Sequence, residues 1–171
     1  MIKPLKKLTH LKKEFAQTMV EFALVFPIVL LITYGIIEVG RMVFIYAGVT
    51  SSAREGARFG AAAGGTVDNS ITPKFAQCAN IRDAVRQTAF LINIPDADIQ
   101  IWYDRGPGSS IVANNCPPPY SFGQYPIKNG DRIIVHVTAH YAPVISLLGF
   151  NGFDITKENA RTILTKININ P

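Results

Sequence analysis

The sequence predicts an α+β fold in which a long N-terminal helix crosses a membrane, continues as a stalk and packs against a small head with an antiparallel sheet. Three observations lead to this prediction. A basic tail is followed by an apolar run, helical sequence continues well beyond that run, and short segments of alternating apolar residues recur later in the chain. The 171 residues suffice for one domain and an anchor.

The positive charge of the chain is concentrated at its N-terminus. The net charge is +5, from 17 basic and 12 acidic side chains. Five lysines precede residue 17 and Glu14 alone opposes them, so we interpret residues 1–16 as a basic cytoplasmic leader. Since the rest of the chain is nearly neutral, we expect no nucleic-acid partner.

We predict that residues 17–41 form a transmembrane helix. The uncharged stretch 22–37 has 16 residues, which span about 24 Å as a helix against a hydrocarbon core of about 30 Å. Lysines precede the run and none follows before Lys74, which predicts a single pass of the cytoplasmic membrane with the N-terminus in the cytoplasm. A cleaved secretory signal peptide fits poorly, because no small-residue cleavage site follows closely.

Three charged residues lie at the two ends of this span. Glu21 is costly in lipid unless it is paired or lies at the interface, so it is a candidate functional residue. The alternative is that Glu21 simply lies among the headgroups. Glu38 and Arg41 are three residues apart, and on a helix they can partly neutralise each other.

Residues 16–22 resemble the processing site of type IV pilin-like proteins. In that class a short basic leader ends in a small residue, usually Gly, and a glutamate follows at the fifth position of the mature chain. The resemblance implies that Ala16 ends the leader, that Gln17 becomes the new N-terminus and that Glu21 pairs with the N-terminal amine of a neighbouring subunit. Ala16 departs from the usual Gly, so a retained leader is the alternative.

More specifically, the chain resembles the TadE-like family, pseudopilins of the tight-adherence (Flp, type IVc) pilus system. The resemblance covers about residues 17–63 and rests on residues 20–25, Pro27, residues 35–41 and residues 53–58. It implies a minor pseudopilin that assembles through its N-terminal helix, with helix-assembly positions at Glu21, Pro27, Glu38 and Arg41. The implied partners are the membrane, other pilin or pseudopilin subunits, the pilus assembly platform and a prepilin peptidase.

Beyond Arg41 we predict continued helix to about residue 63, so that residues 42–64 form a stalk and the two glycines at 64 and 65 end the helix. Small residues recur every fourth position and define a packing seam, which consists of Ser52, Gly56, Gly60 and Gly64. Such a seam lets another backbone approach closely. Either a neighbouring subunit or the protein's own sheet would occupy it.

Residues 65–171 are predicted to form an extracytoplasmic α+β head. Apolar residues at threes and fours indicate a helix over residues 74–91. Alternation predicts strands over residues 99–103, 132–141 and 161–169, whereas residues 104–130 have neither pattern and are interpreted as a loop. Residues 143–150 are interpreted as an apolar loop that could touch a partner or the membrane surface.

Cys78 and Cys116 are the two cysteines of the chain. If the head lies outside the cytoplasm, a disulfide between them is the expected state, and it would tie the long loop to the helix. Two buried free thiols are the alternative.

No enzyme motif is present, so we expect no catalysis, no cofactor and no small-molecule substrate. His136 and His140 face the same side of a predicted strand but lie about 13 Å apart, too far to share a metal ion. A second hypothesis for the function is a membrane-tethered binding module, in which the span is only an anchor. Glu21 distinguishes the two hypotheses, because a simple anchor does not need a carboxylate there.

Overall fold

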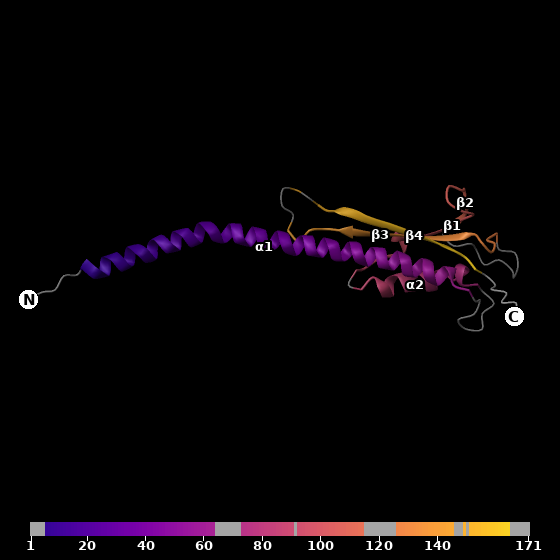
Figure 1. Ribbon diagram of the computed structural model, residues 1–171, viewed down its shortest axis with the longest axis horizontal. Helices are drawn as coiled ribbons and strands as arrows, with labels where there is room; N and C mark the ends of the chain where they lie inside the picture. Colours follow the sequence, from indigo (N-terminus) through magenta and orange to yellow (C-terminus); the bar gives the residue numbers. More distant parts are fainter. Residues whose placement is uncertain are drawn as a thin grey trace, which may run out of the picture. The chain divides into compact units, whose positions relative to one another are not determined.

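The computed structural model describes residues 6–63, 73–90, 92–114, 126–145, 149 and 151–164, with side chains from Gln17 onward (Figure 1). The chain forms two compact units, Met1–Arg41 and Met42–Pro171. The first unit contains helix only, and the second contains the C-terminal part of the same helix and a small α+β head.

Helix α1 runs from Lys6 to Ala61 over 56 residues. It begins earlier than expected, since part of the basic leader is helical, and it ends two residues before the predicted position. Pro27 lies inside it and removes one backbone donor, which membrane helices tolerate. The last turn is tightened by a hydrogen bond from the Ala62 amide to the Phe59 carbonyl, 3.3 Å long.

The head contains a four-stranded antiparallel sheet in the order β2-β1-β3-β4, which confirms the predicted α+β class. The strands are β1 (Ile99–Asp104), β2 (Ile111–Asn114), β3 (Arg132–Tyr141) and β4 (Phe153–Thr162). β3 and β4 pair along their full lengths, from Arg132 opposite Thr162 to Tyr141 opposite Phe153. The helical residues are η1 (Lys74–Ala76), α2 (Cys78–Thr88) and η2 (Asp96–Asp98).

Two predictions about the strands were wrong. β4 occupies Phe153–Thr162, of which only residues 161 and 162 had been predicted as strand, and residues 163 and 164 do not belong to it. The remainder of the predicted strand, residues 165–169, lies outside the described residues. β4 is an edge strand whose inner face is only partly covered, so charged side chains are tolerated there. Lys157 and Arg161 occupy inner positions, and the sequence of β4 therefore lacks the apolar alternation by which a strand is predicted. β2 lies within the predicted loop 104–130, and its four residues are too few to show a periodicity.

The predicted helix over residues 74–91 is a 3₁₀ turn, η1, followed by the shorter helix α2. The 3₁₀ turn η1 is anchored on the sheet through Tyr103 of β1. Its hydroxyl donates to the carbonyl of Phe75 across 2.5 Å, and burial raises the pKa of this tyrosine.

One face of the sheet forms the core with α1 and α2, and the other face is more exposed. Most of the buried apolar side chains come from four elements, and they include Val49, Ala53 and Ala57 of α1, Ile81 and Val85 of α2, Ile99, Ile101 and Tyr103 of β1, and Ile133, Val135 and Val137 of β3. This alternation along β3 is the one that the sequence predicted.

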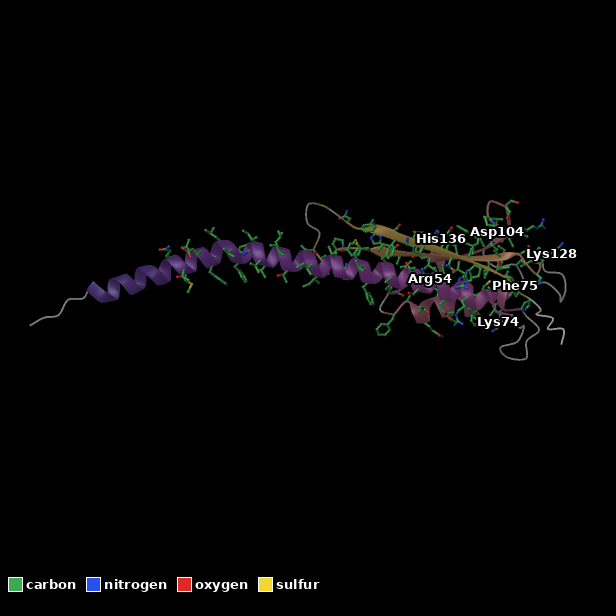
Figure 2. All side chains as sticks on the ribbon, in the orientation of Figure 1. Arg54, Lys74, Phe75, Asp104, Lys128 and His136 are labelled. Atoms are coloured by element: carbon green, nitrogen blue, oxygen red, sulfur yellow. The ribbon has the colours of Figure 1, made fainter. Side chains whose placement is uncertain are left out.

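A partly buried ion pair joins β1 to β3. The Arg132 guanidinium donates from Nε to Asp104 Oδ1 at 2.8 Å and from Nη2 to Oδ2 at 2.5 Å, and the Gly106 amide donates to Oδ1 at 3.2 Å. These hydrogen bonds, that of Arg132 above all, hold the pKa of Asp104 below its usual range. Asp104 lies at the same end of the head as Phe75 and Lys128 (Figure 2).

The Asp104→Asn variant is therefore expected to melt several degrees below the wild type at neutral pH. A carboxylate with a lowered folded-state pKa stabilises the head above its unfolded pKa of about 3.9 and loses this effect as the pH falls through the folded value. The melting difference should accordingly shrink below about pH 3.9. Thermal unfolding followed by circular dichroism at several pH values measures it. Asp83→Asn is the control, because the exposed pair of Asp83 with Arg86 contributes little, and an equal loss in both variants would contradict the prediction.

Candidate functional site

The N-terminal unit exposes apolar side chains on every side of its helix. From Met19 to Val39 the exposed large apolar residues are Met19, Val20, Phe22, Leu24, Val25, Phe26, Ile28, Val29, Leu30, Leu31, Ile32, Ile36, Ile37 and Val39. Within the described residues, one helical stretch, Gln17–Ala61, is long and apolar enough to cross a membrane, and its most apolar window is not buried. Such a surface requires lipid or other helices around it.

Glu21 interrupts this apolar surface near its N-terminal end. Its Oε1 accepts a hydrogen bond from the side-chain amide of Gln17, one turn earlier, at 3.1 Å. Both residues are exposed, and Phe22 stacks on Phe26 beside them with ring centroids 5.1 Å apart. An amide does not neutralise a carboxylate, so in an apolar surrounding Glu21 still requires a cation. Ala16, the residue before Gln17, lies within α1.

A second polar group lies at the other end of the unit. Arg41 Nε lies 3.5 Å from Glu38 Oε2, and the Tyr34 hydroxyl donates to Glu38 Oε1 at 3.1 Å. Glu38 is only 8% exposed. The structure thus brings together Glu38 and Arg41 and adds Tyr34, which the sequence analysis missed although its i, i+4 spacing from Glu38 was available.

The packing seam lies in the second unit and faces the protein's own head. A Cβ added at Gly56 would lie 2.5 Å from Val85 Cγ2 of α2 and 3.1 Å from Val135 Cγ1 of β3. One added at Gly60 would collide with Ile133 Cδ1 of β3. Ser52 is fully buried, with its hydroxyl donating to the Gly48 carbonyl at 2.7 Å. At these three positions the seam is therefore filled by the protein's own head and not by a neighbouring subunit.

The seam extends one turn further toward the N-terminus than predicted. A Cβ at Gly48 would collide with Ile92 Cδ1, and Gly48 precedes Ser52 by four residues, the same spacing. The sequence analysis missed Gly48 although the spacing signal was present. Gly64, the last predicted member, lies outside the described residues. The seam thus packs against the head, which occupies the positions of Gly48, Gly56 and Gly60.

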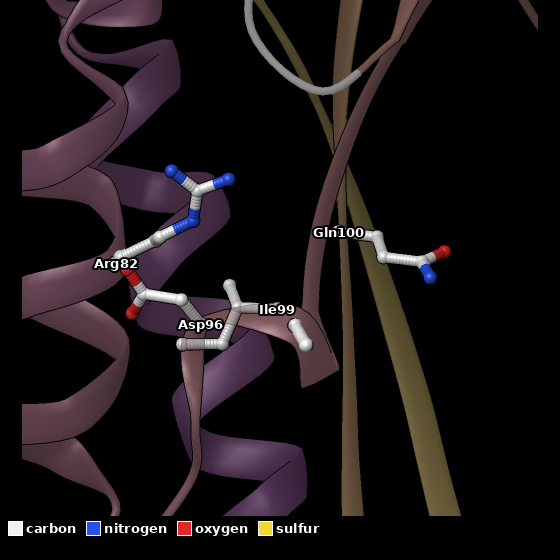
Figure 3. A pocket seen from close by; sticks show the side chains of 5 residues that line it. Arg82, Asp96, Ile99 and Gln100 are labelled. Atoms are coloured by element: carbon white, nitrogen blue, oxygen red, sulfur yellow. The ribbon is translucent and has the colours of Figure 1, made fainter.

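A cleft of about 380 Å³ lies in the head, lined by Arg82, Asp96, Ala97, Ile99 and Gln100. Asp96 forms an ion pair with Arg86, whereas Nε of Arg82 is buried without a hydrogen-bond partner. Figure 3 shows the Arg82 guanidinium turned away from the Asp96 carboxylate. This lining has neither a pair of carboxylates nor a nucleophile beside a base, so it does not form acid–base or nucleophilic machinery.

The disulfide between Cys78 and Cys116 was the remaining predicted site, and no metal site was predicted. Cys78 is nearly buried at the start of α2, and no cysteine of the described residues is a free thiol. Cys116 lies outside the described residues. Among the residues with described side chains, no group of three His, Cys, Asp or Glu is placed to hold a metal ion.

Comparison with known families gives a match for the N-terminal segment of the chain. Residues 16–58 match the family model described as TadE-like protein. No curated protein and no solved structure matches the chain. The matched segment begins at Ala16, contains Glu21, Pro27, Glu38 and Arg41, and ends just after Gly56, so the resemblance noted in the sequence is confirmed over this segment.

Proposed function

We propose that this chain, a TadE-like protein associated with a tight-adherence pilus, acts as a minor pseudopilin that assembles through its N-terminal helix. The proposed role is structural and involves no catalysis or cofactor. The observation that carries the proposal is the combination of an apolar surface on every side of α1 with a carboxylate, Glu21, near its start.

Lipid alone accounts for the apolar surface but not for Glu21. An acidic side chain at the centre of a membrane helix costs about 2.5–3.5 kcal/mol on insertion scales, and less toward the interface. A cation from a neighbouring helix offsets this cost and adds a specific contact. A subunit cut after Ala16 would carry such a cation at the α-amine of Gln17.

The proposal includes a topology and a set of partners. Residues 17–41 cross the cytoplasmic membrane, the basic leader lies in the cytoplasm, and the head lies outside, as the distribution of lysines indicates. The partners are other pilin or pseudopilin subunits, the assembly platform and, at Ala16 and Gln17, a prepilin peptidase. The proposed filament role and cell adhesion depend on these contacts.

A disulfide between Cys78 and Cys116 belongs to the same proposal, because it requires a head outside the cytoplasm. The absence of a free thiol among the described residues supports it. It would close a loop of about 40 residues and contribute about 3–4 kcal/mol in the chain-entropy description.

Intact mass and N-terminal sequencing of the native chain test this proposal. The chain is taken from the membrane fraction and from sheared filaments, with and without reduction. We expect it to begin at Gln17 and to gain two hydrogens on reduction. The fraction that contains it shows whether it enters the filament or stays at its base.

The matched control for processing is Ala16→Gly, which restores the residue usual in the pilin-like class. We expect it to be cut at least as completely as the wild type. If both chains begin at Met1, proteolytic processing is wrong and the leader is retained. If the mass is unchanged by reduction, the disulfide is wrong.

A further inference from the structure

The direction of β3 along α1 shows which end of the head faces the start of the second unit. Ile133 packs near Gly60 and Val135 packs near Gly56, so β3 runs in the opposite direction to α1. Two residues of the strand, about 6.6 Å, therefore correspond to four residues of the helix, about 6 Å. From Val135 to Tyr141 the strand advances about 20 Å, or about thirteen helix residues toward the N-terminus. Tyr141 therefore lies near the level of Val43.

Exposed apolar side chains gather at this end of the head. Val144 and Ile145 follow β3 and are 71% and 53% exposed, and Phe153 begins β4. Val43 and Phe44 of α1 are also exposed. We call these five residues, Val43, Phe44, Val144, Ile145 and Phe153, the apolar rim. Several exposed apolar residues gathered at one place mark an interaction surface, whereas single ones do not.

The two segments that carry the rim are themselves uncharged, and charged residues flank them. Residues 42–53 and residues 141–153 are all uncharged. Charge begins directly beyond these segments, at Arg41 and at Asp154, whose Oδ1 lies 2.7 Å from His140 Nδ1. Further along β4, Lys157 Nζ lies 4.4 Å from the ring centroid of Tyr46. In a membrane protein, apolar side chains contact the acyl chains, aromatic rings lie at the interface, and lysines reach the headgroups. The rim, Tyr46 and Lys157 follow this order.

We propose that the apolar rim inserts into the headgroup–acyl boundary of the membrane that residues 17–41 cross. Helix α1 continues past Arg41 without a break, so Val43 and Phe44 are the next exposed large apolar residues along the helix after the span. A lipid surface is the occupant that this continuity and the uncharged rim segments favour. The inference rests on the proposed membrane span, and it makes the head itself a membrane-contacting element.

Quenching of tryptophan fluorescence by brominated lipid tests the insertion. The full chain is reconstituted in phosphatidylcholine vesicles with or without bromine on the acyl chains. Trp102, the single tryptophan, is first replaced in Trp102→Phe. Ile145→Trp then places a probe in the rim, and Ile111→Trp places one on β2, at 54% exposure almost equal to the 53% of Ile145. Ile111 pairs with Asp104, which pairs with Arg132, so it lies at the opposite end of the head.

We expect bromination to lower the emission of the Ile145→Trp variant about twofold, because an inserted group lies about 5–10 Å deep, and to leave Ile111→Trp nearly unchanged. Phe153→Trp, a conservative exchange, should repeat the result for Ile145→Trp.

Equal emission in both lipids for the Ile145→Trp and Phe153→Trp variants would overturn the inference, as would equal quenching at Ile111. Alkaline extraction of the same vesicles separates the inference from the proposed function. A chain that stays in the pellet without rim quenching overturns the inference alone, whereas a chain that is released overturns the membrane span as well.

Discussion

Replacing Glu21 with alanine should reduce filament assembly at least about tenfold while the chain remains in the membrane. The physical reason is that the carboxylate near the start of the span is expensive in lipid unless a neighbouring subunit supplies a cation, and a contribution of about 1.4 kcal/mol already corresponds to a tenfold change. The alanine variant loses this contact and keeps an apolar span, so its insertion should be unchanged. Filaments are counted by electron microscopy, and insertion is measured by alkaline extraction of membranes.

Two further variants identify which property of Glu21 is needed. Glu21→Gln keeps the size and the hydrogen-bonding capacity but removes the charge, so it should assemble as poorly as the alanine variant. Glu55→Gln makes the same chemical change further along α1, where Glu55 pairs with Arg58 through Nε and Oε2 at 2.8 Å on an exposed surface. That pair contributes little, so assembly should continue. Normal filaments with Glu21→Ala would show that the span is only an anchor.

Replacing Gly56 with leucine should prevent the head from folding onto α1. The Cβ alone would lie 2.5 Å from Val85 Cγ2 and 3.1 Å from Val135 Cγ1, and both valines are fully buried. Because β-branched side chains are stiff, neither can turn away easily. Alanine at the same position should lower the free energy of unfolding by about 1–3 kcal/mol through overpacking. The higher helix propensity of alanine relative to glycine, about 1 kcal/mol, should partly offset this loss. Thermal unfolding and limited proteolysis of the full chain in detergent measure both variants.

Gly40→Ala is the matched control on the same helix. A Cβ at Gly40 meets nothing within 4 Å, so this variant should leave the melting of the head unchanged. A Gly56→Leu variant that resists proteolysis like the wild type would contradict the packing of α1 between α2 and β3. If that variant kept its resistance to proteolysis but no longer assembled into filaments, the seam would contact a neighbouring subunit instead of the head.

Local chemistry explains which predictions succeeded. β3 has one face buried and one exposed, so its apolar alternation from Ile133 to Tyr141 could be read directly. β4 obtains its place from ten pairs with β3, and those contacts are absent from its own sequence, in which Lys157 and Arg161 occupy inner positions. β2 likewise exists because β1 offers it a partner.

The sequence by itself determined the features that depend on neighbours along the chain. These are the basic leader, the apolar span, the carboxylate of Glu21 at its start and the four-residue spacing of the seam. Only the tertiary structure shows which residues pack against the small residues of the seam. Glycine permits a close approach but does not specify which backbone or side chain approaches. The tertiary structure placed Val85 and Val135 against Gly56, and paired Phe153 of β4 with Tyr141 of β3. Contacts between residues far apart in the chain leave no periodic mark, which is why only the folded chain shows them.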